Sequence, residues 1–337
     1  MSVSILLVGG AGYVGSSVSY VLAQQGYRVV VLDAFLHDQQ VPQPWATVVR
    51  GDCGDTALVT SLIREHHITA VMHFAALIEV GLSVTQPADF YYNNVVNTLR
   101  LLDVLRANGV QHIIFSSTCA IYGLPQTPTL AEDHPFAPIN PYGRTKLAVE
   151  YMLSDYAHAY GMRYVSLRYF NAAGALPEVG IGEQHQPETH VIPLLFKALD
   201  QGKPFTIYGT DYDTPDGTCI RDYIHIHDLA LAHLKALQLL QQGAASAVFN
   251  LGSGTGCSVQ QLVAEAEKVS QRQARIIYSP RRPGDAPVLV ANIDHARCHL
   301  SWQPHHSSLP TILHAAWQFY QAQKTIPQEQ VELAKSA

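Results

Sequence analysis

The stretch "GGAGYVG" (residues 9–15) lies between a short apolar run and a helical pattern, and it decides the fold. Its first glycine, Gly9, allows a tight turn after a strand, and the second, Gly12, lets the backbone approach a pyrophosphate. The third, Gly15, lets the following helix pack closely against the strand. The N-terminus of that helix favours negative charge. In this context the pattern predicts a dinucleotide-binding loop rather than a glycine turn without a ligand.

An acidic residue follows at the end of the second expected strand, "YRVVVLD" (27–33). The carboxylate of Asp33 can accept hydrogen bonds from the hydroxyls of an adenosine ribose. It also repels the 2′-phosphate that distinguishes NADP from NAD. The sequence therefore predicts NAD as the cofactor.

Continuous apolar runs alternate with helical patterns through the first half of the chain. Such runs are typical of strands buried on both faces of a parallel sheet, and their alternation with helices is typical of an α/β fold. We therefore expect a doubly wound parallel sheet, the Rossmann arrangement. The expected strands are 4–10, 27–33, 68–76, 110–118 and 163–171, and the expected helices are 15–26, 56–67 and 93–109.

The second half of the chain has a different sequence pattern. Prolines and glycines become frequent, and the periodicity of the apolar residues breaks into short pieces. This change predicts a second, smaller α/β domain that binds the substrate, made of 172–221 and 255–325. The dinucleotide-binding domain is expected to span 1–171 and to be rejoined by about 222–254, which return to a strand, a helix and a strand. The polar tail at 326–337 is expected to fray.

The composition narrows the range of partners. The 337 residues carry a net charge of −6 without a long basic run, so neither nucleic acid nor an anionic membrane is expected as a main partner. No apolar run is long enough for a membrane-spanning helix, and the start "MSVSILLVGG" fits a first strand better than a signal peptide. The five cysteines lack CxxC spacing, which favours a reducing cytoplasm over a disulfide scaffold.

Two histidines, His225 and His227 in "IHIHD", would share one face of a strand by alternation. No third residue with metal-ligand spacing follows them. No metal is therefore expected.

The stretch "NPYGRTKLAVEYML" (140–153) places Tyr142 and Lys146 four residues apart on an expected helix, and so on one face. A tyrosine hydroxyl is a poor base at neutral pH, because its ordinary pKa is about 10. A nearby lysine ammonium and a positively charged nicotinamide would favour the phenolate. The pair is a candidate for acid–base catalysis. The alternative is a packed tyrosine beside a solvated lysine, which for this pattern alone is the more frequent outcome.

A further candidate lies at the end of an expected strand in "FSSTCAIYG" (115–123), where Ser116, Ser117 and Thr118 follow one another. Ligands bind at the carboxyl ends of parallel strands. The hydroxyl of Thr118 could hydrogen-bond the substrate oxygen that Tyr142 deprotonates. The alternative is a polar strand end that is capped by its own hydroxyls.

Together these motifs resemble the UDP-glucose 4-epimerase family of extended short-chain dehydrogenases/reductases, from "GGAGYVG" to about "DHARCHLSW". The resemblance implies a tightly held NAD, with Tyr142 as base and acid, Lys146 supporting it and Thr118 as the hydroxyl partner. The segments "GDCGD", "HFAAL", "YYNNVVNT" and "RYFNAAGA" resemble family segments that surround the cofactor. The expected cofactor-binding residues are Gly9, Gly12, Tyr13, Val14, Gly15, Asp33, Asp52, Cys53, Phe74, Ala75, Ala76, Asn93, Ser116, Tyr142, Lys146, Tyr169 and Phe170.

The second half resembles the family's site for the nucleotide sugar, and "DYDTPDGTCIRDYIHIHDLA" (211–230) resembles the epimerases more than their dehydratase or decarboxylase relatives. An arginine fork suits phosphate and a carboxylate suits ribose hydroxyls. The resemblance thus assigns Arg221 and Arg282 to the diphosphate and Asp285 to the uridine ribose. A solvated charged turn is the alternative for 281–285. The expected substrate residues are Thr118, Asn171, His190, Val191, Tyr208, Arg221, Arg282, Asp285 and Leu289.

Several positions depart from the family pattern or distinguish its members. Ile78 replaces a lysine that often reaches the cofactor, and His190 replaces an asparagine at the uracil. Leu289 stands where the family varies between tyrosine and smaller residues, and it is expected to border the C2 substituent of the sugar. Cys119 and Ala120 stand where dehydratases carry an acidic pair, so loss of water from the sugar is not expected.

The resemblance implies reversible inversion at C4 of UDP-glucose and UDP-galactose through a transient 4-keto sugar. A cytoplasmic homodimer is expected. One alternative is 4-epimerisation of another UDP-sugar, such as a UDP-pentose or a UDP-N-acetylhexosamine. Another, from a different class, is a non-catalytic nucleotide-sensing protein on the same fold. A sensor would bind nucleotide and form no product from UDP-galactose.

Overall fold

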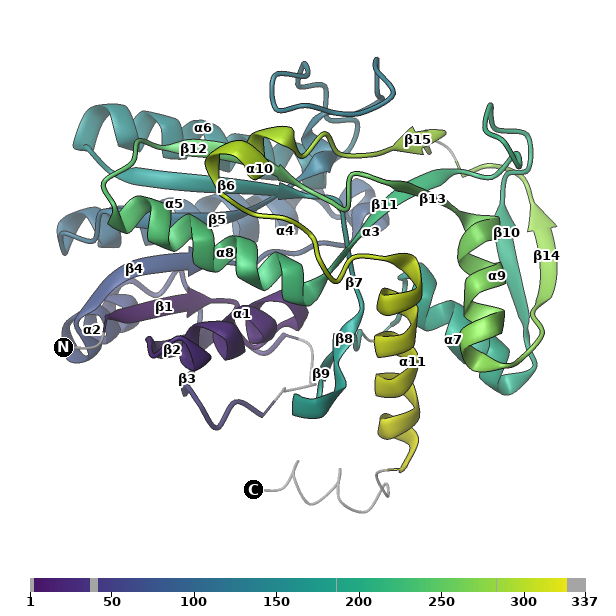
Figure 1. The fold of residues 1–337 in the computed structure, drawn as a ribbon. Helices are drawn as coiled ribbons and strands as arrows, with labels where there is room; N and C mark the ends of the chain where they lie inside the picture. The colour runs from purple at the N-terminus through teal and green to yellow at the C-terminus, as the bar shows by residue number, and fades with distance from the viewer. Residues whose placement is uncertain (1–2, 37–41, 186, 283, 326–337) are drawn as a thin grey trace.

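A seven-stranded parallel sheet forms the centre of the larger part of the molecule (Figure 1). The computed structural model describes residues 3–36, 42–185, 187–282 and 284–325. β1 lies beside both β2 and β4, so successive strands are added on opposite sides of it, and the predicted doubly wound fold is confirmed. In the order β12-β6-β5-β4-β1-β2-β3, the strands are β12 (Ala247–Leu251), β6 (Arg163–Tyr169), β5 (His112–Thr118), β4 (Ile68–His73), β1 (Ser4–Val8), β2 (Arg28–Asp33) and β3 (Thr47–Arg50).

The apolar strands are buried because helices cover both faces of the sheet. In β1, Ile5 and Leu7 belong to one core cluster, and Leu6 and Val8 belong to the other. This division follows from the alternation of side chains along a strand. The covering helices are α1 (Tyr13–Gln24) and α8 (Ile226–Gln241) on one face, and α2 (Thr56–His66), α5 (Asn97–Ala107) and α6 (Pro141–Tyr160) on the other.

Two local differences from the sequence-based expectation have physical causes. The edge strand β3 was not expected, because its residues are exposed or half-buried and form no apolar run of core type. The expected face shared by His225 and His227 does not exist, because β11 (Ile220–His225) ends there and α8 begins at the next residue. The ring Nδ1 of His225 instead caps α8 by accepting from the N–H of His227 at 3.1 Å.

A second, smaller α/β unit is built from the second half of the chain, as predicted. Strands β7, β11, β13 and β15 form a separate four-stranded sheet, whereas β12 pairs with β6 in the central sheet. The domain boundaries stay a prediction, and the tail at 326–337 lies outside the described residues. The elements of the smaller unit are β7 (Asn171–Ala173), β8 (Ala175–Leu176), β9 (Ile181–Gly182), α7 (Val191–Gln201), β10 (Pro204–Tyr208), β11, β13 (Gly256–Ser258), α9 (Val259–Ser270), β14 (Arg275–Ser279), β15 (Val288–Leu289) and α11 (Leu309–Thr325).

Among the described residues, none of the helices has both the length and the apolar character needed to cross a membrane.

Several short helices make up the remaining elements. The short helices are α3 (Val80–Thr85), α4 (Pro87–Tyr91), the π-helix η1 (Tyr92–Val96), the 3₁₀ helices η2 (Cys119–Ile121) and η3 (Pro177–Val179), and α10 (Asp294–His299).

A buried carboxylate, Asp222 in β11, joins the smaller unit to the main sheet. It accepts hydrogen bonds from the backbone N–H groups of Ser253, Gly254 and Ala291 at 2.6, 3.1 and 3.1 Å. The hydroxyl of Ser253 donates a further one at 2.6 Å. Burial raises the pKa of Asp222, and the hydrogen bonds oppose part of that rise. The carboxylate thus holds the loop after β12 and the segment after β15 against β11.

We expect Asp222→Asn to lower the free energy of unfolding by roughly 2–5 kcal/mol. One carboxylate oxygen becomes an amide NH₂ that faces backbone donors, and each buried donor left without an acceptor costs about 1–3 kcal/mol. Urea denaturation followed by circular dichroism measures the change, with the exposed Asp213→Asn as the control. Equal unfolding midpoints for the two variants would show that Asp222 contributes no stability.

Candidate active site

The glycine loop leaves the start of α1 open. A Cβ at Gly9, whose φ is +77°, would lie 2.4 Å from the backbone nitrogen of Ala75, and one at Gly15 would lie 2.5 Å from the carbonyl oxygen of Gly9. Both positions therefore exclude a side chain. A Cβ at Gly12 would meet nothing closer than 3.6 Å, and within the described chain no side chain caps α1. The first turn of α1 can thus receive an anionic group.

Two hydrogen bonds tie the loop to other parts of the chain. The hydroxyl of Tyr13 donates to the carbonyl oxygen of Gly174 at 2.6 Å, and Val14 packs against the core. The side-chain amide of Gln43 donates to the carbonyl oxygen of Gly10 at 2.8 Å. Gln43 was not found from the sequence, because it lies in a connection without a motif or a periodic pattern.

Asp33 lies at the end of β2, beside the same loop. Its Oδ2 accepts from the N–H of Ala11 and its Oδ1 from the N–H of Phe35, each at 2.9 Å. Each carboxylate oxygen has a further lone pair. The residue is half-buried, so its carboxylate is fixed in place and can still accept from the hydroxyls of a ribose.

The chain after β4 runs against the end of β1. The N–H groups of Phe74 and Ala75 both donate to the carbonyl oxygen of Val8, at 2.7 and 3.0 Å. Ala76 follows and is half-buried. These three predicted cofactor residues therefore lie at the carboxyl edge of the sheet, next to the glycine loop.

Asp52 and Cys53 follow β3. The Oδ1 of Asp52 accepts from the N–H of Gly54 at 2.6 Å and from the side-chain amide of Asn97 at 3.0 Å. Cys53 is 8% exposed, and burial raises the pKa of its thiol to about 12. Asp52 is thus fixed by neighbouring groups, whereas Cys53 is a packing residue with an unreactive thiol.

The π-helix η1 places two consecutive asparagines next to the site. Asn93, the predicted one, donates to the Oδ1 of Asn94 at 2.9 Å. Asn94 is buried and bonds both backbone groups of Leu77, at 2.8 and 3.0 Å, and the hydroxyl of Thr145 at 3.1 Å. Asn94 therefore ties the segment that contains Leu77 to α6, and sequence analysis missed it. A π-turn often marks a functional position, but its register is not visible in a helical pattern.

Helix α6 begins at a capping signal. The side chain of Asn140 accepts from the N–H of Gly143 at 2.8 Å, and Pro141 occupies the first helical position. Tyr142 therefore lies in the first turn, at the end that meets the carboxyl edge of the sheet. Lys146 follows one turn later on the same face.

The structure brings three predicted residues together. The hydroxyl of Tyr142 lies close enough to the side chain of Thr118 for that side chain to lower the pKa of the tyrosine, and Thr118 also caps η2 by accepting from the N–H of Ala120 at 3.1 Å. The local cap and the contact with Tyr142 therefore coexist. Lys146 is buried, and its Nζ donates to the carbonyl oxygen of Ser116 at 2.8 Å. The lysine is thus not the solvated residue of the alternative reading.

Burial dominates the electrostatics of this group. It raises the pKa of Tyr142 well above its usual value, Tyr169 adds to the rise, and the side chain of Thr118 opposes it. Burial also lowers the pKa of Lys146 to about 7, against the attraction of Glu150. The tyrosine is therefore protonated in the protein alone. The positive charge that would favour its phenolate must come largely from a bound group.

A buried network behind these residues fixes β5 against α6 and β6. The hydroxyl of Ser117 donates to Glu150 at 2.5 Å, and Glu150 forms an ion pair with Arg168 at 2.5 Å. Arg168 also donates to the hydroxyl of Tyr122 at 2.9 Å. Sequence analysis missed this network, because its partners are far apart in the chain and no motif joins them.

Tyr169 and Phe170 lie at the end of β6. The hydroxyls of Tyr169 and Ser116 share a hydrogen bond of 2.6 Å, and burial raises the pKa of Tyr169 to about 12. Phe170 is 7% exposed, and its N–H donates to the carbonyl oxygen of Leu251 at 3.1 Å. Both predicted residues are therefore placed at the carboxyl edge of the central sheet.

Three of the predicted substrate residues, Asn171, Arg221 and Leu289, lie on strands of the four-stranded sheet. The guanidinium of Arg221 pairs with the carboxylate of Asp285, and the side-chain amide of Asn171 donates to the carbonyl oxygen of Asp222 at 2.7 Å. Leu289 is half-buried and lies opposite Arg221 where β15 pairs with β11.

Arg221 also connects this sheet to the Tyr142 group. Burial raises the pKa of Cys119 to about 12, and the charge of Arg221 opposes that rise. The charge of Arg221 thus acts on the residue that follows Thr118 at the end of β5.

The other predicted substrate residues form two smaller sets. The guanidinium of Arg282 lies 4.3 Å from the ring centroid of Tyr208, and both are exposed. Val191 opens α7 and packs against the core of the smaller unit. The ring of His190 lies between two carboxylates, 2.7 Å from Glu183 and 3.5 Å from Glu188.

Comparison with known proteins identifies the family. The sequence model of the NAD dependent epimerase/dehydratase family matches residues 5–252. A UDP-glucose 4-epimerase of Rhizobium leguminosarum bv. trifolii is 49% identical over 318 residues, which cover 94% of this chain and 97% of the relative. A UDP-glucose 4-epimerase of Rhizobium meliloti (strain 1021) matches to the same extent.

Solved structures agree over nearly the whole chain. The UDP-glucose 4-epimerase of Brucella ovis in complex with NAD has a TM-score of 0.91 and 44% identity, with 94% of this chain and 98% of that chain covered. The enzyme of Stenotrophomonas maltophila, with bound NAD and formylated UDP-arabinopyranose, has a TM-score of 0.91 and 34% identity, with 96% and 99% covered. The chain therefore belongs to the NAD dependent epimerase/dehydratase family, and NAD is its cofactor.

Proposed function

We propose that the chain catalyses the reversible inversion at C4 of UDP-glucose and UDP-galactose through a transient 4-keto sugar. The closeness of Tyr142 to the side chain of Thr118 carries the proposal, because a proton-transfer group and a hydroxyl partner would then share the carboxyl edge of a dinucleotide-binding sheet. The names of the relatives, UDP-glucose 4-epimerase at 49% identity, support the choice of reaction.

The proposed acid–base group is Tyr142. As a phenolate it takes the proton of the sugar 4-OH, and it returns that proton after the opposite face of C4 has turned towards the cofactor. NAD, when bound, would supply the acceptor and the donor for the C4 hydride. Thr118 orients the same oxygen through its hydroxyl. Lys146 adds positive charge near the strand end and holds the carbonyl of Ser116.

The nucleotide part of the substrate would be held while the sugar turns. Arg221 and Arg282 bind the diphosphate, and Asp285 binds the uridine ribose, which is a positioning role. Arg221 pairs with Asp285. The guanidinium that would bind the diphosphate is therefore already oriented by this carboxylate. Asn171, His190, Val191 and Tyr208 are the further substrate residues of the proposal. The proposed cofactor contacts are those predicted at the glycine loop, Asp33 and the ends of β3 to β6.

We expect the purified chain to interconvert UDP-galactose and UDP-glucose without added cofactor, because the hydride is returned in each cycle. Tyr142→Phe should lose at least about 100-fold in turnover, the low end for acid–base catalysis. Binding of UDP should change little, because its proposed contacts lie elsewhere. Product analysis by chromatography and titration with UDP give the two readouts.

The exposed Tyr278→Phe, on β14, is the matched control for that substitution. Dinucleotide released on denaturation of the wild type should be NAD. Near-normal turnover of Tyr142→Phe would remove the acid–base role from the tyrosine. Tight binding of UDP by a wild type that forms no product would favour a nucleotide sensor.

We expect Leu289→Ala to raise the rate on UDP-N-acetylglucosamine relative to UDP-glucose by about 10–200-fold. A leucine fills volume that an N-acetyl group at C2 would need, and steric discrimination per small group is worth about 1–3 kcal/mol. The wild type should prefer the hexoses. Val288→Ala is the control, since neighbouring side chains of a strand point to opposite faces. An unchanged ratio of rates in Leu289→Ala would place the size limit elsewhere.

The chain is proposed to act as a homodimer in the cytoplasm. Exposed apolar side chains lie on α3, η1, α5 and α6, including Val84, Tyr92, Leu99 and Tyr151, and a partner subunit could cover them. The five cysteines are free, which suits a reducing compartment. Sedimentation should give about twice the chain mass of 37.0 kDa. A monomer at micromolar concentration would contradict the dimer.

A further inference from the structure

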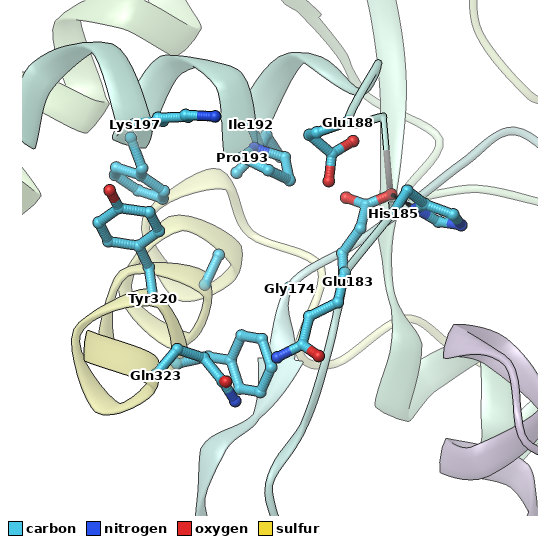
Figure 2. Close-up of a pocket in the computed structure, with 13 residues that line it drawn as sticks. Gly174, Glu183, His185, Glu188, Ile192, Pro193, Lys197, Tyr320 and Gln323 are labelled. Atoms are coloured by element: carbon cyan, nitrogen blue, oxygen red, sulfur yellow. Dashed lines mark ion pairs between the residues drawn. The ribbon is translucent and has the colours of Figure 1, made fainter. Parts of the chain in front are cut away.

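Four side chains that can bind a metal converge in the connection between β9 and α7. They are Glu183, His185, Glu188 and His190, and one ligand atom from each lies within 4.8 Å of the others. The first three side chains are 10%, 18% and 14% exposed, and His190 is 46% exposed. Figure 2 shows the carboxylates of Glu183 and Glu188 pointing towards each other, with the ring of His185 beside them.

The spacing of the ligand atoms is close to that of a coordinated ion. A tetrahedral site with bonds of about 2.0 Å holds its ligand atoms roughly 3.3 Å apart. The Nδ1 of His190 lies 3.5 Å from Glu188 and 2.7 Å from Glu183, and the Nδ1 of His185 lies 3.8 Å from Glu183. Small rotations of these side chains would therefore bring them to coordinating distances.

The backbone orients one of the carboxylates. The Oε1 of Glu188 accepts from the N–H groups of Thr189 and His190, each at 2.8 Å. Hydrogen bonds of this kind fix a ligating group and are a common feature of metal sites. The four residues follow the short pattern Glu-x-His-x-x-Glu-x-His and so lie close together in the sequence.

A cavity gives access to the group. It has a volume of about 270 Å³ and lies between α7, α11 and the β8–β9 hairpin, with Glu183, His185 and Glu188 in its wall (Figure 2). None of the residues that line it is among the predicted cofactor or substrate residues. The cavity therefore offers an ion a path that does not cross the proposed active site.

An ion pair without metal is the simpler reading, since His190 as an imidazolium would lie between two carboxylates. That reading accounts for His190 but not for the second imidazole, whose nitrogen is turned to the same carboxylate oxygen of Glu183. Two imidazoles with two carboxylates form a ligand set that suits Zn²⁺ and related divalent transition-metal ions. Mg²⁺ and Ca²⁺ prefer oxygen ligands alone.

We propose that Glu183, His185, Glu188 and His190 bind one divalent transition-metal ion of the Zn²⁺ type. Four protein ligands leave no open position, as in structural sites. The ion would fasten β9 to the start of α7, and so would fix the segment that contains His190 and Val191. The expectation of no metal rested on His225 and His227 alone and did not consider this pattern. The proposal does not depend on the epimerase reaction.

The test uses the full chain, freed of metal with a chelator and titrated with Zn²⁺ against a competing indicator dye. The wild type should bind one Zn²⁺ per chain with high affinity. Glu188→Gln and His185→Gln should each weaken that binding at least about 100-fold, because loss of an outer partner of a ligand alone costs about 10–100-fold. A glutamine at 188 can still accept from the backbone, so the loop keeps its shape.

Matched controls are Glu65→Gln and His305→Gln, which change exposed residues of the same types outside the cluster. Both should bind Zn²⁺ as the wild type does. Co²⁺ provides a second readout, since its visible absorption bands should appear in the wild type and the controls and be lost in the two loop variants. Zn²⁺ binding that is equal in all five proteins, or absent from the wild type, would overturn the proposal.

Discussion

The buried carboxylate of Asp222 is the interaction on which the arrangement of the two units depends. The four-stranded sheet has short strands and would be a weak unit by itself. Asp222 binds it through Ser253, Gly254 and Ala291 to the loop after β12 and to the segment after β15. Its own carbonyl holds the side chain of Asn171. The position of Arg221 relative to Thr118 follows from these contacts.

The candidate site is assembled from the ends of elements rather than from their middles. Tyr142 lies at the start of α6 and Thr118 at the end of β5, so the cap at Asn140 and the buried Ser117–Glu150 bond both control the distance between them. Burial keeps the tyrosine protonated and weakens the charge of the lysine. The chain therefore supplies position, and much of the charge that activates the site has to arrive with its ligands.

The sequence predicted those parts of the fold and site that rest on local patterns. Apolar runs located the buried strands of the central sheet, because burial on both faces requires apolar residues. The glycine spacing located the loop, because close packing requires residues without a side chain. The edge strand β3 has no apolar run, since its residues are not buried. Asn94 was missed beside Asn93 because a π-turn shifts which of two neighbours faces inwards. The Glu150–Arg168 pair and Gln43 depend on contacts between distant segments, which no local pattern contains.

The hydrogen bond from Tyr13 to Gly174 couples the glycine loop to the segment that leads into β8 and β9. The loop cannot move away without breaking this part-buried bond to a distant part of the chain. We therefore expect the bond to lengthen the residence time of a dinucleotide seated on the loop. In kinetic terms, the coenzyme would then behave as a built-in part of the protein that survives many turnovers, and not as a second substrate that must be exchanged.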